Sequence, residues 1–145
     1  MSGMKKQGLA ILGSTGSIGV QTLDIVRENP DLFEVVTLTA NRNWELLARQ
    51  AVEFDADSVV IADERFYTPL KEALADSQIK VYAGENAVAD VTANSNVDTV
   101  VNALVGYAGM IPTVRSIENG KKVALANKES LVVGGETIMR MAMER

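Results

Sequence analysis

The stretch that decides the fold is residues 9–19, LAILGSTGSIG, where a short apolar run leads into three glycines spaced three residues apart. The apolar residues predict a buried strand, and an amphipathic helix pattern begins at about Ser17. Glycine weakens both strands and helices. Its concentration at this junction therefore indicates either a tight turn or the close approach of a ligand to the backbone.

The same alternation of apolar runs and helical patterns continues along the chain. Strands are expected at residues 9–12, 33–39, 58–62, 80–82, 99–103 and 122–125. Helices are expected at 17–29, at 44–54 after an Asn43 cap, after Asp63, at 85–93, at 110–119 and from about 129 onward. We expect the first helix to bury Ile18, Thr22, Ile25 and Val26. Continuously apolar strands alternating with helices predict a doubly wound, Rossmann-type α/β domain over residues 1–145.

Composition excludes several kinds of chemistry. The 145 residues include no Cys and no His, so thiolate nucleophiles, zinc thiolate sites and a Ser-His-Asp triad are ruled out. The net charge of −5 and the lack of a dense basic cluster argue against nucleic acid as a partner. No apolar run has the roughly 18 residues of a membrane span, and the N-terminal segment does not resemble a signal peptide. We therefore expect a cytoplasmic protein that does not bind membranes.

The glycine segment has the position of a dinucleotide phosphate site. In a doubly wound sheet the turn from the first strand to the first helix receives the pyrophosphate. Gly13 would allow the tight turn, Gly16 would let the phosphates approach the backbone, and Gly19 would let the helix pack closely on the strand. Thr15 and Ser17 offer hydroxyl donors. The spacing G-x-x-G-x-x-G is less common than G-x-G-x-x-G, and a turn without a ligand remains the alternative.

The end of the second strand indicates which dinucleotide binds. NAD-binding folds usually carry an acidic residue there for the ribose hydroxyl, whereas this chain has Asn41, Arg42 and Asn43. Arg42 suits a 2′-phosphate, which favours NADP(H), unless it is merely a solvated loop residue. Asn43 is also placed to cap the next helix.

Two later segments also fall at carboxyl ends of expected strands. Ala103 and the glycines that follow it end the fifth strand, and they form either a cofactor-facing loop or an ordinary connection. Asn127, Lys128 and Glu129 follow the sixth strand. Asn127 and Glu129 suit the start of a helix, but a lysine gains nothing there, so Lys128 suggests an anionic ligand.

Four segments in this order, ILGSTGSIG, TANRN, ALVGYAGMIPT and LANKESLV, closely resemble the N-terminal part of the 1-deoxy-D-xylulose 5-phosphate reductoisomerase family. The resemblance implies an NADPH-dependent, Mg²⁺- or Mn²⁺-dependent enzyme of non-mevalonate isoprenoid biosynthesis. It would rearrange and reduce the phosphorylated substrate 1-deoxy-D-xylulose 5-phosphate to 2-C-methyl-D-erythritol 4-phosphate, and the full-length enzyme would be a homodimer.

The resemblance also implies roles for single residues. The cofactor-binding residues would be Gly13, Thr15, Gly16, Ser17, Ile18, Asn41, Arg42, Asn43, Ala103, Asn127 and Glu129. Lys128 would contact the substrate. The sequence departs from the family at Asn41, where many members have Gly, and at Arg42, where many have Lys; the loop stays cationic.

The family's metal-binding carboxylates lie in an Asp-Ser-Glu motif beyond the segment of Lys128, and this sequence contains no such motif. The resemblance therefore predicts a cofactor-binding domain that binds NADPH but has no catalytic or metal-binding residues and no activity alone.

The alternatives are a non-catalytic NADP(H)-sensing module or another NADP-dependent oxidoreductase. A short-chain epimerase needs a Tyr-x-x-x-Lys pair, but Tyr67 and Lys71 fall in an expected helix away from the ligand edge, and a semialdehyde dehydrogenase needs a cysteine.

Overall fold

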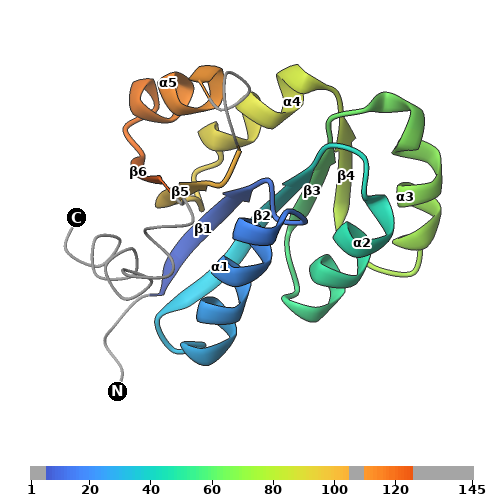
Figure 1. The fold of residues 1–145 in the computed structure, drawn as a ribbon, viewed down its shortest axis with the longest axis horizontal. Helices are drawn as coiled ribbons and strands as arrows, with labels where there is room; N and C mark the ends of the chain where they lie inside the picture. The colour runs from blue at the N-terminus through green and yellow to red at the C-terminus, as the bar shows by residue number, and fades with distance from the viewer. Residues whose placement is uncertain (1–5, 105–109, 126–145) are drawn as a thin grey trace.

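The computed structural model describes residues 6–104 and 110–125, which form a parallel sheet covered by helices (Figure 1). The strands in these ranges are β1 (Gln7–Leu12), β2 (Phe33–Ala40), β3 (Ser58–Ile61), β4 (Lys80–Ala83), β5 (Thr99–Asn102) and β6 (Lys122–Leu125). The helices are α1 (Ser17–Glu28), α2 (Trp44–Glu53), α3 (Tyr67–Ala73), α4 (Glu85–Asp90) and α5 (Met110–Glu118), with short 3₁₀ turns η1 (Glu64–Phe66) and η2 (Val91–Ala93).

The order of the strands places β1 at the point where the chain reverses direction across the sheet. The order is β4-β3-β2-β1-β5-β6, and each of these neighbouring strands pairs in parallel with the next. The chain therefore proceeds from β1 outward through β2 on one side and later from β5 outward on the other. In such sheets ligands bind outside the carboxyl ends of the strands at this switch point.

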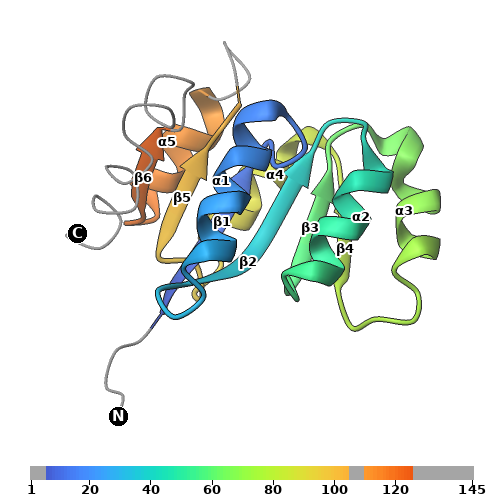
Figure 2. The same ribbon diagram turned by 60° about the horizontal axis from the view of Figure 1, so that its bottom comes forward.

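Helices cover both faces of the sheet, as Figure 2 shows, with α1, α2 and α3 on one face and α4 and α5 on the other. Alternate residues of β1 therefore enter different cores: Leu9 and Ile11 pack under α1 and α2, whereas Ala10 and Leu12 pack on the side of α4. Burial on both faces explains why the strand sequences are continuously apolar. No helix in the described ranges is long and apolar enough to cross a membrane.

The predicted doubly wound fold is confirmed, and the predicted elements within the described ranges have the observed type, with ends that differ by a few residues. The predicted buried face of the first helix was partly wrong. The residues of α1 that are buried are Gly19, Thr22, Leu23 and Val26, while Ile18 and Ile25 are only half-buried. Gly19 packs against the backbone of Gly13 and Ser14 in the loop after β1, and Leu23 is buried on the same helix.

Candidate functional site

The loop between β1 and α1 is anchored to the end of β2. Gly13 has a φ of +81°, a conformation that favours glycine. Its backbone N–H donates to both the carbonyl (3.2 Å) and the hydroxyl (3.1 Å) of Thr39, and the Ser14 N–H donates to the same carbonyl (2.9 Å). The turn therefore has a fixed position relative to the carboxyl ends of two adjacent strands.

A buried polar pair fixes the same loop to α2. Ser14 is fully buried; its hydroxyl donates to Gln50 Oε1 (2.8 Å), and Gln50 Nε2 donates back to the Ser14 carbonyl (3.0 Å). Both groups of the Gln50 amide and both polar groups on Ser14 are thus satisfied without water. The Ser14 side chain faces the interior, which leaves the following residues, Thr15–Ser17, at the surface of the loop.

The N-terminus of α1 is open to an anion. Gly16 is its N-cap and no side chain caps the helix, whose first turn contains no acidic residue. The first backbone N–H groups of a helix have no partner inside it and carry the positive end of its dipole. By contrast, the Asn43 side chain caps α2, accepting from the Leu46 N–H (3.2 Å), and Glu45 lies in the first turn of that helix.

The glycines of the motif differ in what surrounds them. Within the described part of the chain, a Cβ on Gly16 would have only the Gly13 carbonyl oxygen within 4 Å, at 3.8 Å, and Gly16 has an ordinary φ of −75°. A Cβ on Gly19 would overlap that carbonyl and lie 2.6 Å from Ser14 Cα. The fold therefore requires Gly19 but leaves space at Gly16. Ile18 is half-buried and packs against the core under α1.

The loop after β2 presents its polar residues to solvent. Asn41, Arg42 and Asn43 are exposed, and the predicted capping role of Asn43 is confirmed. Arg42 Nε lies 3.4 Å from Asp63 Oδ2, and Arg65 binds the same carboxylate. Hydrogen bonds from Arg65, with a smaller electrostatic contribution from Arg42, lower the pKa of Asp63 to about 2. The carboxylate therefore stays ionised at neutral pH.

Ala103 lies beside the glycine turn at the switch point. It is buried, its N–H donates to the Leu12 carbonyl (2.9 Å), and its backbone lies within van der Waals distance of a Cβ built on Gly13. The structure thus brings the ends of β1, β2 and β5 together. The predicted residues Asn127, Lys128 and Glu129, and the glycines after Leu104, lie outside the described residues.

Sequence reasoning missed three residues that support this site, namely Thr39, Gln50 and Asp63. Gln50 could have been noticed, because it is a polar residue next to the apolar stripe of an expected helix. Asp63 was recognised only as the start of a helix; it caps η1 by accepting from the Arg65 N–H (3.1 Å). Thr39 sits in an apolar strand and gave no signal of a contact with the glycine turn.

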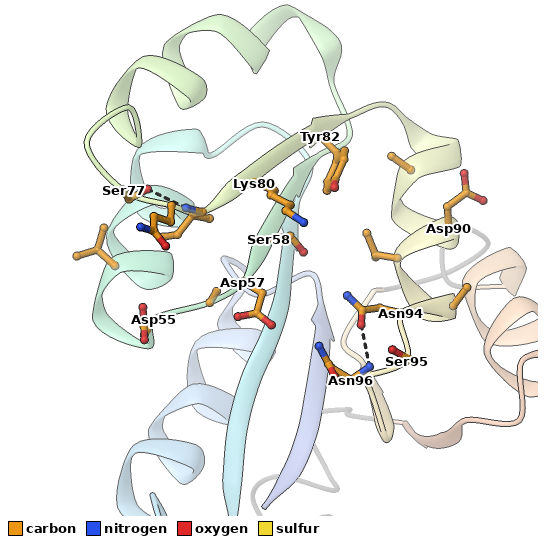
Figure 3. Close-up of a pocket in the computed structure, with 17 residues that line it drawn as sticks. Asp55, Asp57, Ser58, Ser77, Lys80, Tyr82, Asp90, Asn94, Ser95 and Asn96 are labelled. Carbon is orange, nitrogen blue, oxygen red and sulfur yellow. Dashed lines mark hydrogen bonds between the residues drawn. The ribbon is translucent and has the colours of Figure 1, made fainter.

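Two hollows among the described residues lie at the opposite, amino-terminal edge of the sheet. The larger, of about 1150 Å³, opens between the loops before β3 and β4 and the segment after α4, with polar residues such as Asp57, Lys80 and Asn96 around it (Figure 3). Dinucleotides bind doubly wound sheets at the carboxyl edge, so these hollows are not the cofactor site.

The Tyr67 and Lys71 side chains contact each other (3.2 Å between Tyr67 Oη and Lys71 Nζ) on α3. Helix α3 packs against α2 and β4, whereas the glycine turn lies at β1 and β5. The pair is therefore separated from the switch point by β2 and β3.

Comparisons with known proteins identify relatives of this chain. A family model described as 1-deoxy-D-xylulose 5-phosphate reductoisomerase matches residues 9–135. The reductoisomerase of Porphyromonas gingivalis is 56% identical over 96% of this chain and 36% of that protein. That of Bacteroides fragilis is 51% identical over 99% of this chain and 37% of that protein. The chain thus spans little more than a third of the length of these relatives.

Solved structures of reductoisomerases are similar to this chain in fold and sequence. A reductoisomerase from Zymomonas mobilis in complex with NADPH has a TM-score of 0.80 and 42% identity, over 97% of this chain and 37% of that one. A DOX-P reductoisomerase in complex with NADPH, fosmidomycin and magnesium has a TM-score of 0.79 and 35% identity, over 95% of this chain and 34% of that one.

Proposed function

The chain belongs to the 1-deoxy-D-xylulose 5-phosphate reductoisomerase family, and on this basis we propose that it holds the NADPH of that enzyme. The protein of which it is the cofactor-binding domain converts 1-deoxy-D-xylulose 5-phosphate to 2-C-methyl-D-erythritol 4-phosphate. NADPH, when bound, supplies the hydride for the reduction. We further propose that the complete enzyme acts in the cytoplasm as a homodimer.

One observation carries the proposal: α1 begins after Gly16 without a side-chain cap, and among the described residues only the Gly13 carbonyl oxygen comes within 4 Å of a Cβ built on Gly16. A phosphate at this position accepts hydrogen bonds from the first backbone N–H groups of the helix and meets the positive end of its dipole. Ser14, Thr39 and Gln50 hold the loop in place before any ligand binds. The residues present therefore fit a dinucleotide.

The proposal assigns the phosphates to the surface of the glycine loop. Thr15, Gly16 and Ser17 line the pyrophosphate through backbone N–H and hydroxyl groups, and Ile18 contributes its backbone because its side chain packs on the core. Ala103 lies along the cofactor at the end of β5. Asn127 and Glu129 contact the nicotinamide half, and Lys128 contacts the phosphorylated substrate.

The loop of Asn41, Arg42 and Asn43 takes the adenosine end, with Arg42 at the 2′-phosphate. The exposed Arg42 guanidinium lies 3.4 Å from Asp63 Oδ2 as an ion pair, and its five N–H groups are the donors we assign to the ligand. Three or more acidic side chains that could hold a metal ion do not come together anywhere in the described ranges. A solved relative is a complex with magnesium, and we assign no ligand of that ion to the described part of this chain.

The proposal is tested by titrating the chain with NADPH and with NADH while following the fluorescence of the reduced cofactor. We expect tighter binding of NADPH. Arg42→Ala should weaken NADPH binding about ten- to a hundredfold, since a hydrogen bond to a charged group is worth about 1.5–3 kcal/mol, and should change NADH binding little.

Arg27→Ala is the matched control because it removes the same charge at the far end of α1. Arg27 lies ten residues beyond Ser17, which corresponds to about 15 Å along a helix, more than the screening length of about 8 Å at physiological salt. Its replacement should leave both affinities unchanged. Equal binding of the two cofactors, or no binding of either, would contradict the proposed function.

A further inference from the structure

A second loop lies along the one that carries Arg42. Beyond the last paired residues of β2 and β3, the Ala62 N–H donates to the Ala40 carbonyl (2.8 Å) and the Asp63 N–H donates to the Asn41 carbonyl (3.0 Å). These bonds continue the strand pairing into the loops at the carboxyl edge. They hold Asp63 beside Arg42, although the two residues are far apart in the sequence.

Asp63 binds a second arginine, Arg65, more firmly than it binds Arg42. Arg65 Nη2 donates to Asp63 Oδ2 (2.7 Å) and Arg65 Nε to Oδ1 (3.0 Å), which is the paired, fork-like geometry of strong arginine–carboxylate contacts. Arg42 Nε lies 3.4 Å from the same Oδ2. Because both guanidinium groups contact one oxygen atom, they are close enough for a single phosphate group to reach both.

The exposure of the three side chains shows which of them face a ligand. The Asp63 side chain is 14% exposed, whereas the side chains of Arg42 and Arg65 are 67% and 72% exposed. The carboxylate is covered and the arginines lie outside it. Arg65 uses two of its five N–H donors on Asp63, so the others remain available. The Glu64 carboxylate lies against Gly84, at the start of α4.

A purely structural role does not account for this arrangement well. Exposed ion pairs contribute little to stability, and one arginine would already neutralise Asp63. Two guanidinium groups share the Asp63 carboxylate, while the Glu64 carboxylate lies near Gly84. The loop where the adenosine end of the cofactor is expected thus presents two arginines around one carboxylate.

We propose that Arg65 is a second cation for the 2′-phosphate of NADPH, held beside Arg42 by Asp63, and that it adds to the preference for NADPH over NADH. This inference rests on the proposed function, because it requires the adenosine end at this loop. Asp63 is a positioning residue that orients both guanidinium groups.

The test compares Arg65→Ala, Arg65→Lys and the control Arg27→Ala in fluorescence titrations of the chain with NADPH and NADH. Arg65→Ala should weaken NADPH binding about three- to tenfold and leave NADH binding unchanged. The expected loss of affinity lies between that for removing an exposed ion pair and that for removing a hydrogen bond to a charged group. Arg65→Lys should retain part of the affinity for NADPH, because lysine keeps the positive charge but lacks the planar guanidinium that can donate two parallel hydrogen bonds. Circular dichroism should show that the variants fold like the unmodified chain.

The two proposals fail in different ways. If Arg42→Ala weakens NADPH binding but Arg65→Ala does not, the role of Arg65 is overturned and the proposed function stands. If Arg65→Ala weakens NADPH and NADH binding equally, Arg65 does not contact the 2′-phosphate and the inference is also overturned. If the unmodified chain binds no NADPH, the proposed function and this inference fall together.

Discussion

Two glycines of the β1–α1 loop are expected to respond in opposite ways to the same substitution. Gly16→Ala adds a methyl group where the nearest atom of the described residues, the Gly13 carbonyl oxygen, is 3.8 Å away and φ is −75°. Gly19→Ala adds one that overlaps that carbonyl and lies 2.6 Å from Ser14 Cα. The first change should therefore affect the ligand and the second the fold.

The magnitudes follow from these surroundings. At Gly16, alanine is a poorer N-cap by about 0.5–1 kcal/mol, but it reduces the entropy of the unfolded chain by about 0.4–1 kcal/mol. The melting temperature should thus stay within about 3 °C of the original. At Gly19 the overlap is with backbone, which cannot move aside. Its cost exceeds the gain of about 1 kcal/mol in helix propensity, and we expect a net loss of about 1–3 kcal/mol, or about 3–10 °C.

The assay is a thermal melt of each variant followed by an NADPH titration at a temperature where both remain folded. Gly16→Ala should keep the melting temperature and lose at least about tenfold in NADPH affinity, because its methyl group stands where the phosphates approach the backbone. A Gly16→Ala variant that binds NADPH with unchanged affinity would refute the placement of the pyrophosphate at this loop. An unchanged melting temperature in Gly19→Ala would refute the packing argument.

Two further predictions concern the residues that support the loops. Gln50→Leu should destabilise the fold by about 1–3 kcal/mol, because it removes the partner of the buried Ser14 carbonyl and leaves the Ser14 hydroxyl only its longer contact with the Thr39 carbonyl (3.3 Å). Urea titration measures the loss. Arg49→Leu on the exposed side of the same helix is the control, and equal effects of the two would contradict the prediction. The pKa of the Asp63 carboxylate is lowered to about 2. The ionised carboxylate should therefore stabilise the fold at a pH above its ordinary pKa near 4, and this stabilisation should be lost as the pH falls toward 2. The difference in melting temperature between the unmodified chain and Asp63→Asn should therefore shrink over that pH range, and a difference that stays constant would show that Asp63 does not titrate as described.

The sequence by itself determined the class of the fold and located the element ends to within a few residues. Helix caps and stops act within a few residues, so Asn43 at the start of α2 and the positive-φ Gly120 after α5 could be predicted locally. The continuous apolar runs required burial on both faces and therefore a parallel sheet under two helical layers. The glycine loop followed from its position between a strand and a helix.

Only the tertiary structure decided which residues support the site. Ser14 meets Gln50 across 36 residues, and Arg42, Asp63 and Arg65 come together because β2 and β3 are neighbours in the sheet. Strand order and the distance of closest helix approach set these contacts, and neither leaves a periodic pattern in the sequence. The buried face of α1, which contains Gly19, Thr22, Leu23 and Val26, was also decided by tertiary contacts, because the backbone of Gly13 and Ser14 lies directly against Gly19.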